Sequence, residues 1–256
     1  MNSAIQKLLK DCYFLDTEKN WNDLAHRVSA IYLPAEEYIV NKIFIPSSPT
    51  LMNANTNGKR LGTLSSCFPM NIDDSIDGIY EALKECAIVT KYGGGVGINF
   101  GNLRSSREVI TTLDRKSSGP VPFMKNFDAM LDGIQQGGVR RGAGMGLYPI
   151  DGPDILEFIR AKKDRTTLTR LNLSVNITNS FYQQLDENPD SIHRVKYKDG
   201  SYHDLYDDDK PVTVKELWNE ICFYAWDNAE PGIFNGDIAK ERCSVTNLNE
   251  DVLCNP

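Results

Sequence analysis

The feature that most constrains the fold is a regular alternation of short apolar segments with longer amphipathic ones between residues 64 and 179. The short segments "LSSCFPMNI", "GVGINFG", "LYPI" and "LNLSVNITN" are predicted to be strands. The segments between them carry apolar residues at helical spacing, and Asp74 and Ser75 stand where the cap of the first helix is expected. This order of strand, helix, strand and helix predicts an α/β fold with parallel strands.

Different patterns flank this central region. Residues 1–45 contain three segments with helical spacing and are predicted to form a short helical N-terminal segment. Residues 46–62 are rich in Pro, Ser, Asn and Gly, which is typical of a long loop, and we expect the second domain, 46–256, to begin here. Farther along, "VKYKDGSYHD" predicts a hairpin with Asp-Gly in its turn, and "VKELWNEICFYAWDN" predicts an aromatic-rich helix.

Composition argues against several classes of protein. The 256 residues contain no apolar run of the ~18 residues that a membrane span requires. The net charge of −7 argues against a nucleic-acid partner, because such binding needs a basic face. The N-terminus lacks a signal-peptide core, which favours the cytoplasm, so the six cysteines are expected to be thiols. They form no Cys-x-x-Cys pair and the three histidines are scattered, so no metal site is expected.

The stretch "KYGGGVGINFGNLR", residues 91–104, places three glycines before an apolar segment that ends on an arginine. The pattern G-x-G-x-x-G fails in each register because the sixth residue is Ile98, Asn99 or Phe100, and no Gly-Lys-Ser/Thr follows for a P-loop. Glycine has no Cβ, so a ligand could approach this backbone closely. A tight entry into a strand explains the run equally well.

Two further features could carry chemistry. Cys67 stands beside two serines in a predicted strand, where a buried cysteine is more often an inert core residue than a redox group. The segment "QQGGVRRGAGMG", residues 135–146, flanks paired arginines with glycines. A guanidinium offers a fixed fork of donors for phosphate or base recognition, although a solvated basic loop would have the same composition.

Eight motifs, in one order, resemble the catalytic subunit of ribonucleotide reductases, most closely the adenosylcobalamin-dependent (class II) branch and its near relatives among class I large subunits. The similarity extends from about Pro46 to the C-terminal residue. It implies the first half of the family's ten-stranded α/β barrel, preceded by the short helical segment. The motifs are "PSSPTLMNANT", "LSSCFPMNIDDSIDGI", "KYGGGVGINFGNLR", "SSGPVPFMKNFD", "QGGVRRGAGMG", "PDILEFI", "LNLSVNIT" and "EPGIF".

The resemblance implies roles on the substrate side. Cys67 corresponds to one half of the redox pair that supplies two electrons to the ribose, and a dithiol suits this task because loss of the 2′-hydroxyl as water is a reduction. Ser66, the backbone around Gly95, and Thr50 would hold the ribose and phosphate of the ribonucleotide substrate. Asn255 matches an asparagine that orients substrate hydroxyls. A thioredoxin-like protein would restore the dithiol.

Other motifs resemble the family's allosteric specificity site, where a deoxynucleoside triphosphate, or ATP, acts as effector and selects the base to be reduced. Asp74 matches the acidic residue that binds the effector ribose, and Arg104 matches an effector phosphate ligand. Residues 105–118 correspond to the first flexible effector loop. The helices around 75–90 and 123–136 would pack against a second copy in a homodimer, with the effector at that interface.

The glycine-arginine segment resembles the family's second effector loop. Gln136 and Arg140 match its effector-binding positions. In the family this loop lies between effector and substrate and relays the identity of the base. A glycine-rich loop with two conformations could carry such coupling.

The chain departs from the family pattern at its end. It closes with "EDVLCNP", where the family continues with Cys-Gly-Glu, the radical cysteine and the general base. Cys254 precedes Asn-Pro, so it is not assigned the radical role. A split gene and an intein junction would each explain this ending. We expect a C-terminal half to supply the missing groups and the residues that face adenosylcobalamin, and we expect this chain to be inactive alone.

Two other interpretations stay open. A class I large subunit, whose radical comes from a metal-containing partner, shares nearly all residues of this region with a class II enzyme. A non-catalytic fragment that senses deoxynucleotides would keep the effector motifs without reacting. Stimulation by adenosylcobalamin separates the first from a class II enzyme, and a downstream reading frame that opens with Cys-Gly-Glu argues against the second.

Overall fold

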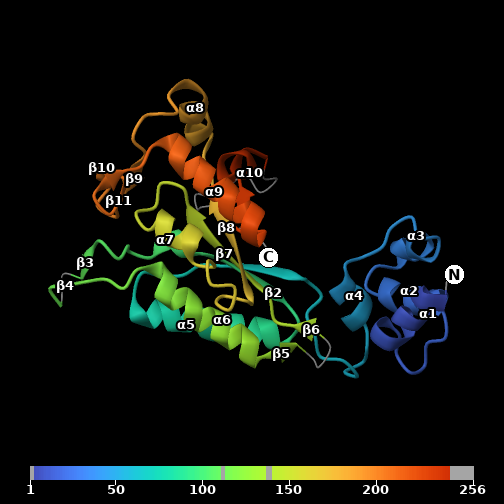
Figure 1. Ribbon diagram of the computed structural model, residues 1–256. Coiled ribbons are helices and arrows are strands. Elements are labelled where there is room, and N and C mark those ends of the chain that lie inside the picture. Colours follow the sequence, from blue (N-terminus) through green and yellow to red (C-terminus); the bar gives the residue numbers. More distant parts are fainter. Residues whose placement is uncertain (1–2, 111–112, 137–139, 243–256) are drawn as a thin grey trace.

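The computed structural model describes residues 3–110, 113–136 and 140–242. Its centre is a five-stranded sheet of order β1-β2-β7-β8-β13, in which each neighbouring pair is parallel (Figure 1). The strands are β1 (Cys67–Met70), β2 (Gly95–Asn99), β7 (Gly144–Pro149), β8 (Leu171–Asn176) and β13 (Gly232–Phe234). The helices that connect them include α5 (Ile76–Lys91), α6 (Pro120–Gly133), α7 (Ile155–Arg160) and α9 (Val214–Asn228). The predicted α/β fold with parallel strands is confirmed.

One face of the sheet is covered by helices and forms the main core. Alternating residues of the strands line this face, among them Val96, Ile98, Leu171, Leu173 and Val175. Phe127 of α6 meets Phe100 edge-on with ring centroids 5.5 Å apart, and Phe158 of α7 stacks on Tyr148 at 5.3 Å. All four rings are at most 1% exposed. Alternation along each strand therefore places the apolar side chains under the helices.

Helix α5 begins with a side-chain cap, but Asp74 is not that cap. The Ser75 Oγ accepts a hydrogen bond from the Gly78 N–H at 3.0 Å. The residues that α5 buries are Ile79, Ala82, Cys86 and Thr90. The helix itself is confirmed. Its apolar spacing predicts a buried stripe of Ile76, Ile79, Leu83 and Ala87, but Ile76 is 62% exposed, so the observed stripe is rotated. The observed stripe follows the i, i+3, i+7 spacing of one helix face.

The N-terminal helices have a core of their own. They are α1 (Ser3–Leu8), η1 (Leu9–Tyr13), α2 (Trp21–Ser29), η2 (Leu33–Ala35), α3 (Glu36–Val40) and α4 (Ser48–Asn53), and they form a separate group in Figure 1. Helix α4 lies within the predicted loop, with Pro49 in its first turn. Leu51 is 5% exposed and belongs to the same core as Trp21 and Leu24. This core therefore continues past residue 45, the boundary expected from sequence, to Ala54.

Short antiparallel hairpins project from the connections between the main elements. In the described residues they are β3 (Val109–Ile110) with β4 (Arg115–Lys116), β5 (Gln135–Gln136) with β6 (Arg140–Arg141), β9 (Arg194–Lys196) with β10 (Tyr202–Asp204), and β11 (Tyr206–Asp207) with β12 (Lys210–Pro211). The β9–β10 pair confirms the predicted Asp-Gly hairpin. The described part also contains α8 (Asn179–Glu187), α10 (Gly236–Arg242) and η3 (Phe100–Asn102). None of its helices is long and apolar enough to cross a membrane.

Candidate active site

The amino-terminal end of the sheet brings together three of the predicted substrate-side residues. Cys67, the first residue of β1, is the register partner of Gly95, the first residue of β2. The Gly95 N–H donates to the Ser66 carbonyl at 2.7 Å. Cys67 is partly exposed. It therefore lies where two parallel strands begin, beside backbone that carries no Cβ.

Thr50 reaches the same segment from the N-terminal unit. Its Oγ1 donates to the Leu64 carbonyl at 2.8 Å. Three residues later, the Asn53 Nδ2 donates to the Thr63 carbonyl, also at 2.8 Å. These bonds fix α4 against the residues that lead into β1. Leu64, the bonding partner of Thr50, precedes Ser66 by two positions.

Two of the three consecutive glycines have structural explanations. Gly93 has a φ of 91°, in the left-handed region that favours glycine. The Gly94 N–H donates to the Val89 carbonyl at 3.0 Å, which closes the last turn of α5 as in a Schellman motif. A Cβ on Gly94 would lie 2.8 Å from the Phe68 ring. The interpretation of bare backbone for a ligand therefore rests on Gly95.

The face of the sheet that bears Cys67, called the polar face below, carries small and polar residues beside the apolar Met145 and Leu147. By register, Gly97, Met145 and Asn172 form one row across β2, β7 and β8. Ser174 lies one row farther along, and its Oγ donates to the Met145 Sδ at 3.3 Å. Sequence reasoning did not single out these residues. The signal was present in "LNLSVN", where polar residues alternate with the apolar residues of the core.

Cys86 shows the opposite environment for a thiol. It lies on the buried face of α5 and is 0% exposed, and burial raises its pKa to about 12. A thiol with such a pKa stays protonated at neutral pH and is a poor nucleophile. The four described cysteines, residues 12, 67, 86 and 222, are thiols. Of these, Cys67 is the one that lies on the polar face of the sheet.

Asp74 and Arg104, both predicted effector ligands, are bonded to each other. The Arg104 Nε donates to Asp74 Oδ2 at 2.8 Å, and its backbone N–H donates to Oδ1 at 3.1 Å. The side chains are 32% and 29% exposed for Arg104 and Asp74, respectively. The pair lies after the carboxyl end of β2 and before the first turn of α5. Asp74 thus orients a guanidinium that solvent still reaches.

Both ends of the predicted first effector loop, residues 105–118, converge on one buried carboxylate, Asp154. Ser106 donates to it twice, from N–H to Oδ2 at 2.9 Å and from Oγ to Oδ1 at 2.6 Å. Burial raises the pKa of Asp154, and the Ser106 bonds partly offset this effect. Gly119, at the other end of the loop, has a φ of 73°, and a Cβ there would lie 3.1 Å from Asp154 Oδ2. The "PDILEFI" motif contains Asp154, but its sequence pattern does not indicate a role for this residue.

Gln136 and Arg140 are register partners in the β5–β6 hairpin, which lies against α5. The hairpin is near the carboxyl end of α5, because a Cβ on Gly142 would lie 3.0 Å from the Thr90 Cγ2. Asp74 precedes the other end, and the 16 residues of α5 span about 24 Å. Figure 1 shows β3–β4 and β5–β6 at opposite ends of α5 and α6. The four predicted effector residues therefore form two separate pairs.

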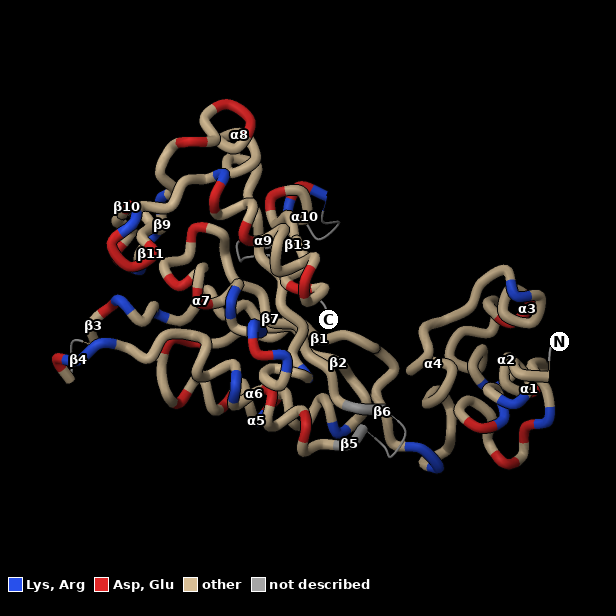
Figure 2. Tube along the Cα trace, viewed as in Figure 1, with Lys and Arg blue, Asp and Glu red and all other residues tan. Residues whose placement is uncertain are grey.

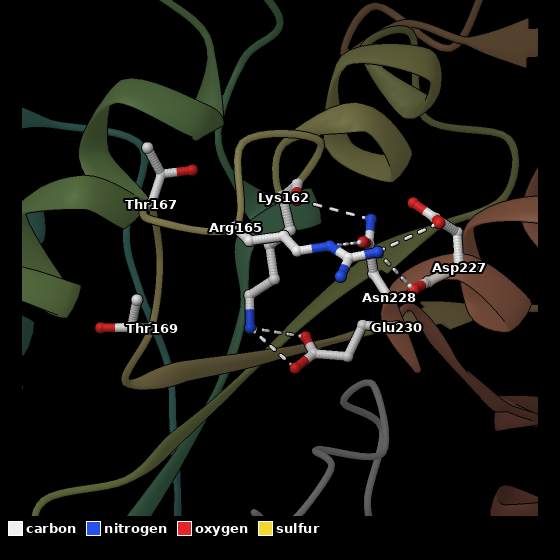
Figure 3. A pocket seen from close by; sticks show the side chains of 7 residues that line it. All are labelled: Lys162, Arg165, Thr167, Thr169, Asp227, Asn228 and Glu230. Atoms are coloured by element: carbon white, nitrogen blue, oxygen red, sulfur yellow. Dashed lines mark hydrogen bonds and ion pairs between the residues drawn. The ribbon is translucent and has the colours of Figure 1, made fainter.

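A polar pocket of about 330 Å³ opens at the amino ends of β8 and β13 (Figure 3). It is lined by Lys162, Arg165, Thr167, Thr169, Asp227, Asn228 and Glu230. The Lys162 Nζ lies 2.7 Å from both carboxylate oxygens of Glu230, and Oε2 also accepts from the Leu173 N–H at 2.7 Å. Arg165 pairs with Asp227 at 3.1 Å. Since acidic partners already neutralise both cations, this cluster joins the ends of α7 and α9 rather than offering a site for an anion.

The remaining predicted site residue, Asn255, lies outside the described residues, so the structure does not place it. Thr50, Ser66, Cys67 and Gly95 form one group at the amino end of the sheet. Within the described ranges, no group of three or more His, Cys, Asp or Glu residues is arranged to hold a metal ion.

Known proteins are similar to this chain over much of its length. The relative from Thermoplasma acidophilum, a vitamin B12-dependent ribonucleoside-diphosphate reductase, is 39% identical over 222 residues, which cover 86% of this chain and 28% of that protein. The ribonucleoside-diphosphate reductase large subunit of vaccinia virus is 40% identical over 126 residues, 48% of this chain and 16% of that protein. This chain thus spans less than a third of the length of these curated relatives.

A solved structure shows the same fold at greater distance. The class Id ribonucleotide reductase alpha subunit of Actinobacillus ureae superposes with a TM-score of 0.72 at 22% identity, covering 94% of this chain and 41% of that one. The family model described as the ribonucleotide reductase barrel domain matches residues 65–254. Because that match covers most of the sequence, this chain belongs to the ribonucleotide reductase large-subunit family and carries part of its barrel domain.

Proposed function

We propose that this chain is the N-terminal part of a ribonucleotide reductase catalytic subunit, which reduces ribonucleotides to deoxyribonucleotides by thiyl-radical chemistry. The observation that carries the proposal is the position of Cys67, at the start of a strand, beside the bare backbone of Gly95 and on the polar face of the sheet. Thr50 and Ser66 border the same point, which supports a role in holding ribose and phosphate. The relatives are named ribonucleoside-diphosphate reductases.

In the proposed reaction, the C2′–OH bond of the ribonucleotide breaks and a C2′–H bond forms. Two thiols become one disulfide and supply the two electrons, while the hydroxyl leaves as water. Cys67 supplies one thiol. We assign the second thiol, the radical cysteine and the general base to the C-terminal half, and a thioredoxin-like protein then reduces the disulfide. The described cysteines are thiols, which suits a reducing compartment, and we place the protein in the cytoplasm.

Adenosylcobalamin is the proposed source of the radical, because the relatives in Thermoplasma acidophilum and Mycobacterium tuberculosis are named vitamin B12-dependent. No residue of the described ranges is assigned to hold this group, and its binding is placed in the C-terminal half. The alternative is a class I large subunit, and the relatives from Neurospora crassa and vaccinia virus carry large-chain names without B12.

The two separated pairs of effector residues support a homodimer with a deoxynucleoside triphosphate, or ATP, at its interface. A nucleotide is too short to reach both ends of α5, about 24 Å apart. A second copy, antiparallel along α5 and α6, would bring the first loop of one chain to the second loop of the other. Ile76, Tyr80 and Ile88 of α5 are 62%, 50% and 47% exposed and offer an apolar surface for this contact.

The test is nucleotide reduction by this chain with and without the polypeptide that carries the rest of the barrel domain. A labelled ribonucleoside diphosphate or triphosphate, a dithiol and adenosylcobalamin are supplied, and deoxyribonucleotide is measured by chromatography. The proposal predicts product only when both polypeptides are present. Turnover by this chain alone would contradict the division of roles. Stimulation by a metal-loaded partner instead of adenosylcobalamin would identify class I, and effector binding without reduction in any combination would favour a sensor.

A further inference from the structure

The β9–β10 hairpin has no part in the proposed function, yet its turn contacts the first effector loop. Lys198, in this turn, donates its backbone N–H to Glu108 Oε1 at 2.9 Å. Its Nζ donates to the carbonyls of Asn102 at 2.5 Å and Gly101 at 3.3 Å. These contacts reach the chain on both sides of Arg104.

Glu108 connects the hairpin to the effector loop itself. Its second carboxylate oxygen, Oε2, accepts from the Ser105 N–H at 2.6 Å, directly after Arg104. Its backbone carbonyl accepts from the Ser117 N–H at 2.9 Å, at the far end of the loop. A single residue thus bonds to the hairpin and to both ends of residues 105–118. The bond between Glu108 and Lys198 joins positions 90 residues apart in the sequence, so it depends on the tertiary fold.

The hairpin is anchored firmly enough to act as a support. Val195 and Leu205 are 0% exposed and belong to the main core. The Lys196 N–H donates to the Asp151 carbonyl at 2.7 Å, two residues beyond the end of β7. The position of the turn is therefore set by the sheet rather than by the effector loop.

The adjoining β11–β12 hairpin adds a second contact to the loop. The Arg107 Nη2 donates to the Tyr206 carbonyl at 3.1 Å. Asp207 is held in turn by Arg160 of α7 through two bonds of 2.8 and 2.7 Å. Figure 2 shows acidic residues gathered around β11, across from basic residues of the loop. The loop is thus braced from one side by elements that the sheet holds in place.

We propose that Glu108 and Lys198 are positioning residues for the effector site. Through them the hairpin sets the conformation of residues 105–110 and 113–118, and so the affinity and base selectivity for deoxynucleoside triphosphates. The inference rests on the proposed effector role of this loop. An ionised carboxylate can accept from two N–H donors at once, one on each oxygen. A glutamine would turn its amide NH2 toward one of those donors, so Glu108→Gln breaks the bridge at almost unchanged volume.

The experiment measures binding of the four deoxynucleoside triphosphates to the full chain and hydrogen exchange of peptides within 105–118. Glu108→Gln is expected to weaken binding about tenfold, to change the affinity ratios among the four nucleotides and to speed exchange in the loop. Lys198→Ala keeps its backbone bond to Glu108 and is expected to weaken binding about threefold, with recovery in Lys198→Arg. Matched controls are Lys196→Ala on the same hairpin and Glu187→Gln on α8, each expected within about twofold of the unmodified chain.

Thermal unfolding separates a positioning role from a loss of fold. We expect Lys198→Ala to have the same midpoint temperature of unfolding as the unmodified protein. Unchanged affinities and unchanged loop exchange in both Glu108→Gln and Lys198→Ala would overturn the inference while leaving the effector site intact. If the unmodified chain binds none of the four nucleotides, the proposed effector function fails and the positioning role fails with it.

Discussion

The two faces of the central sheet differ in what they contribute. On the helix-covered face, Val96, Ile98 and Leu173 are at most 2% exposed and belong to one continuous core. On the opposite face, Gly97 and Asn172 share a row with Met145, and Cys67 stands at the strand entry. The helix-covered face therefore holds the fold together, and the opposite face presents groups that can meet a substrate.

Cys67 and Cys86 show a similar contrast. Cys86 is fully buried on the inner face of α5, where burial raises its pKa to about 12. Cys67 is partly exposed beside Gly95. Residue type alone does not separate a core thiol from a candidate redox thiol, because Cys86 lies on the buried face of a helix and Cys67 at the start of a strand on the opposite face of the sheet.

The largest expected effect is on catalysis. Replacement of Cys67 by serine should reduce dithiol-driven nucleotide reduction to background in the assembled enzyme, because a hydroxyl cannot form the disulfide that supplies the electrons. The urea midpoint of unfolding should stay unchanged, since the residue is partly exposed. Full turnover by Cys67→Ser would remove the polar face from the proposed chemistry.

Stability should respond to substitutions on the other face. Phe158 is 0% exposed and stacks on Tyr148, so Phe158→Ala should lower the free energy of unfolding by about 3–5 kcal/mol. Asn172→Ala, on the exposed part of the Cys67 face, should change it by less than about 0.5 kcal/mol. Urea titration of both variants measures the contrast, and equal losses would break it.

Alkylation should separate the two thiols without mutation. With iodoacetamide at pH 8 in native buffer, Cys67 is expected to react well before Cys86, whose thiol is buried and stays protonated. Peptide mass spectrometry over time gives the two rates, and the order should disappear in urea. Equal native rates would show that the packing of α5 against the main core does not shield Cys86.

The smallest expected effect is a pH dependence of the free energy of unfolding, caused by the buried His193. Burial lowers the pKa of His193, whose Nε2 lies 3.0 Å from the Ile150 carbonyl. The folded state therefore binds fewer protons than the unfolded state once the pH falls below about 6.5, and stability should decrease there. His193→Gln cannot titrate and should flatten the slope of unfolding free energy between pH 7 and 5.5. An unchanged slope would exclude His193 as its source.

Local sequence patterns predict the sheet because strands and helices have different periods. The apolar alternation of "LNLSVN" predicts β8, and the amphipathic pattern before it predicts the connecting helices. Helix α4 is missed because a segment rich in Pro, Ser and Asn is typical of a loop. Its formation depends on burial of Leu51 beside Trp21, a tertiary contact that local composition does not contain.

The residues of the candidate site were predictable where they lie within a single short motif. The "SSC" and "GGG" motifs name Ser66, Cys67 and Gly95, and parallel pairing brings them together. Contacts between distant motifs were not predictable from the residues. Asp74 and Arg104 lie 30 positions apart, and their mutual ion pair depends on the crossover from β1 through α5 to β2. Asp154 was missed because its role arises only where α7 meets the loop at Ser106.

The most direct test of the account follows the oxidation state of Cys67 through one turnover. Pre-reduced chain, assembled with the polypeptide that completes the barrel, is mixed with ribonucleotide and adenosylcobalamin in the absence of external dithiol. The account predicts one deoxyribonucleotide per active site, with Cys67 recovered in a disulfide by peptide mass spectrometry. Product formed while Cys67 stays a free thiol would contradict it.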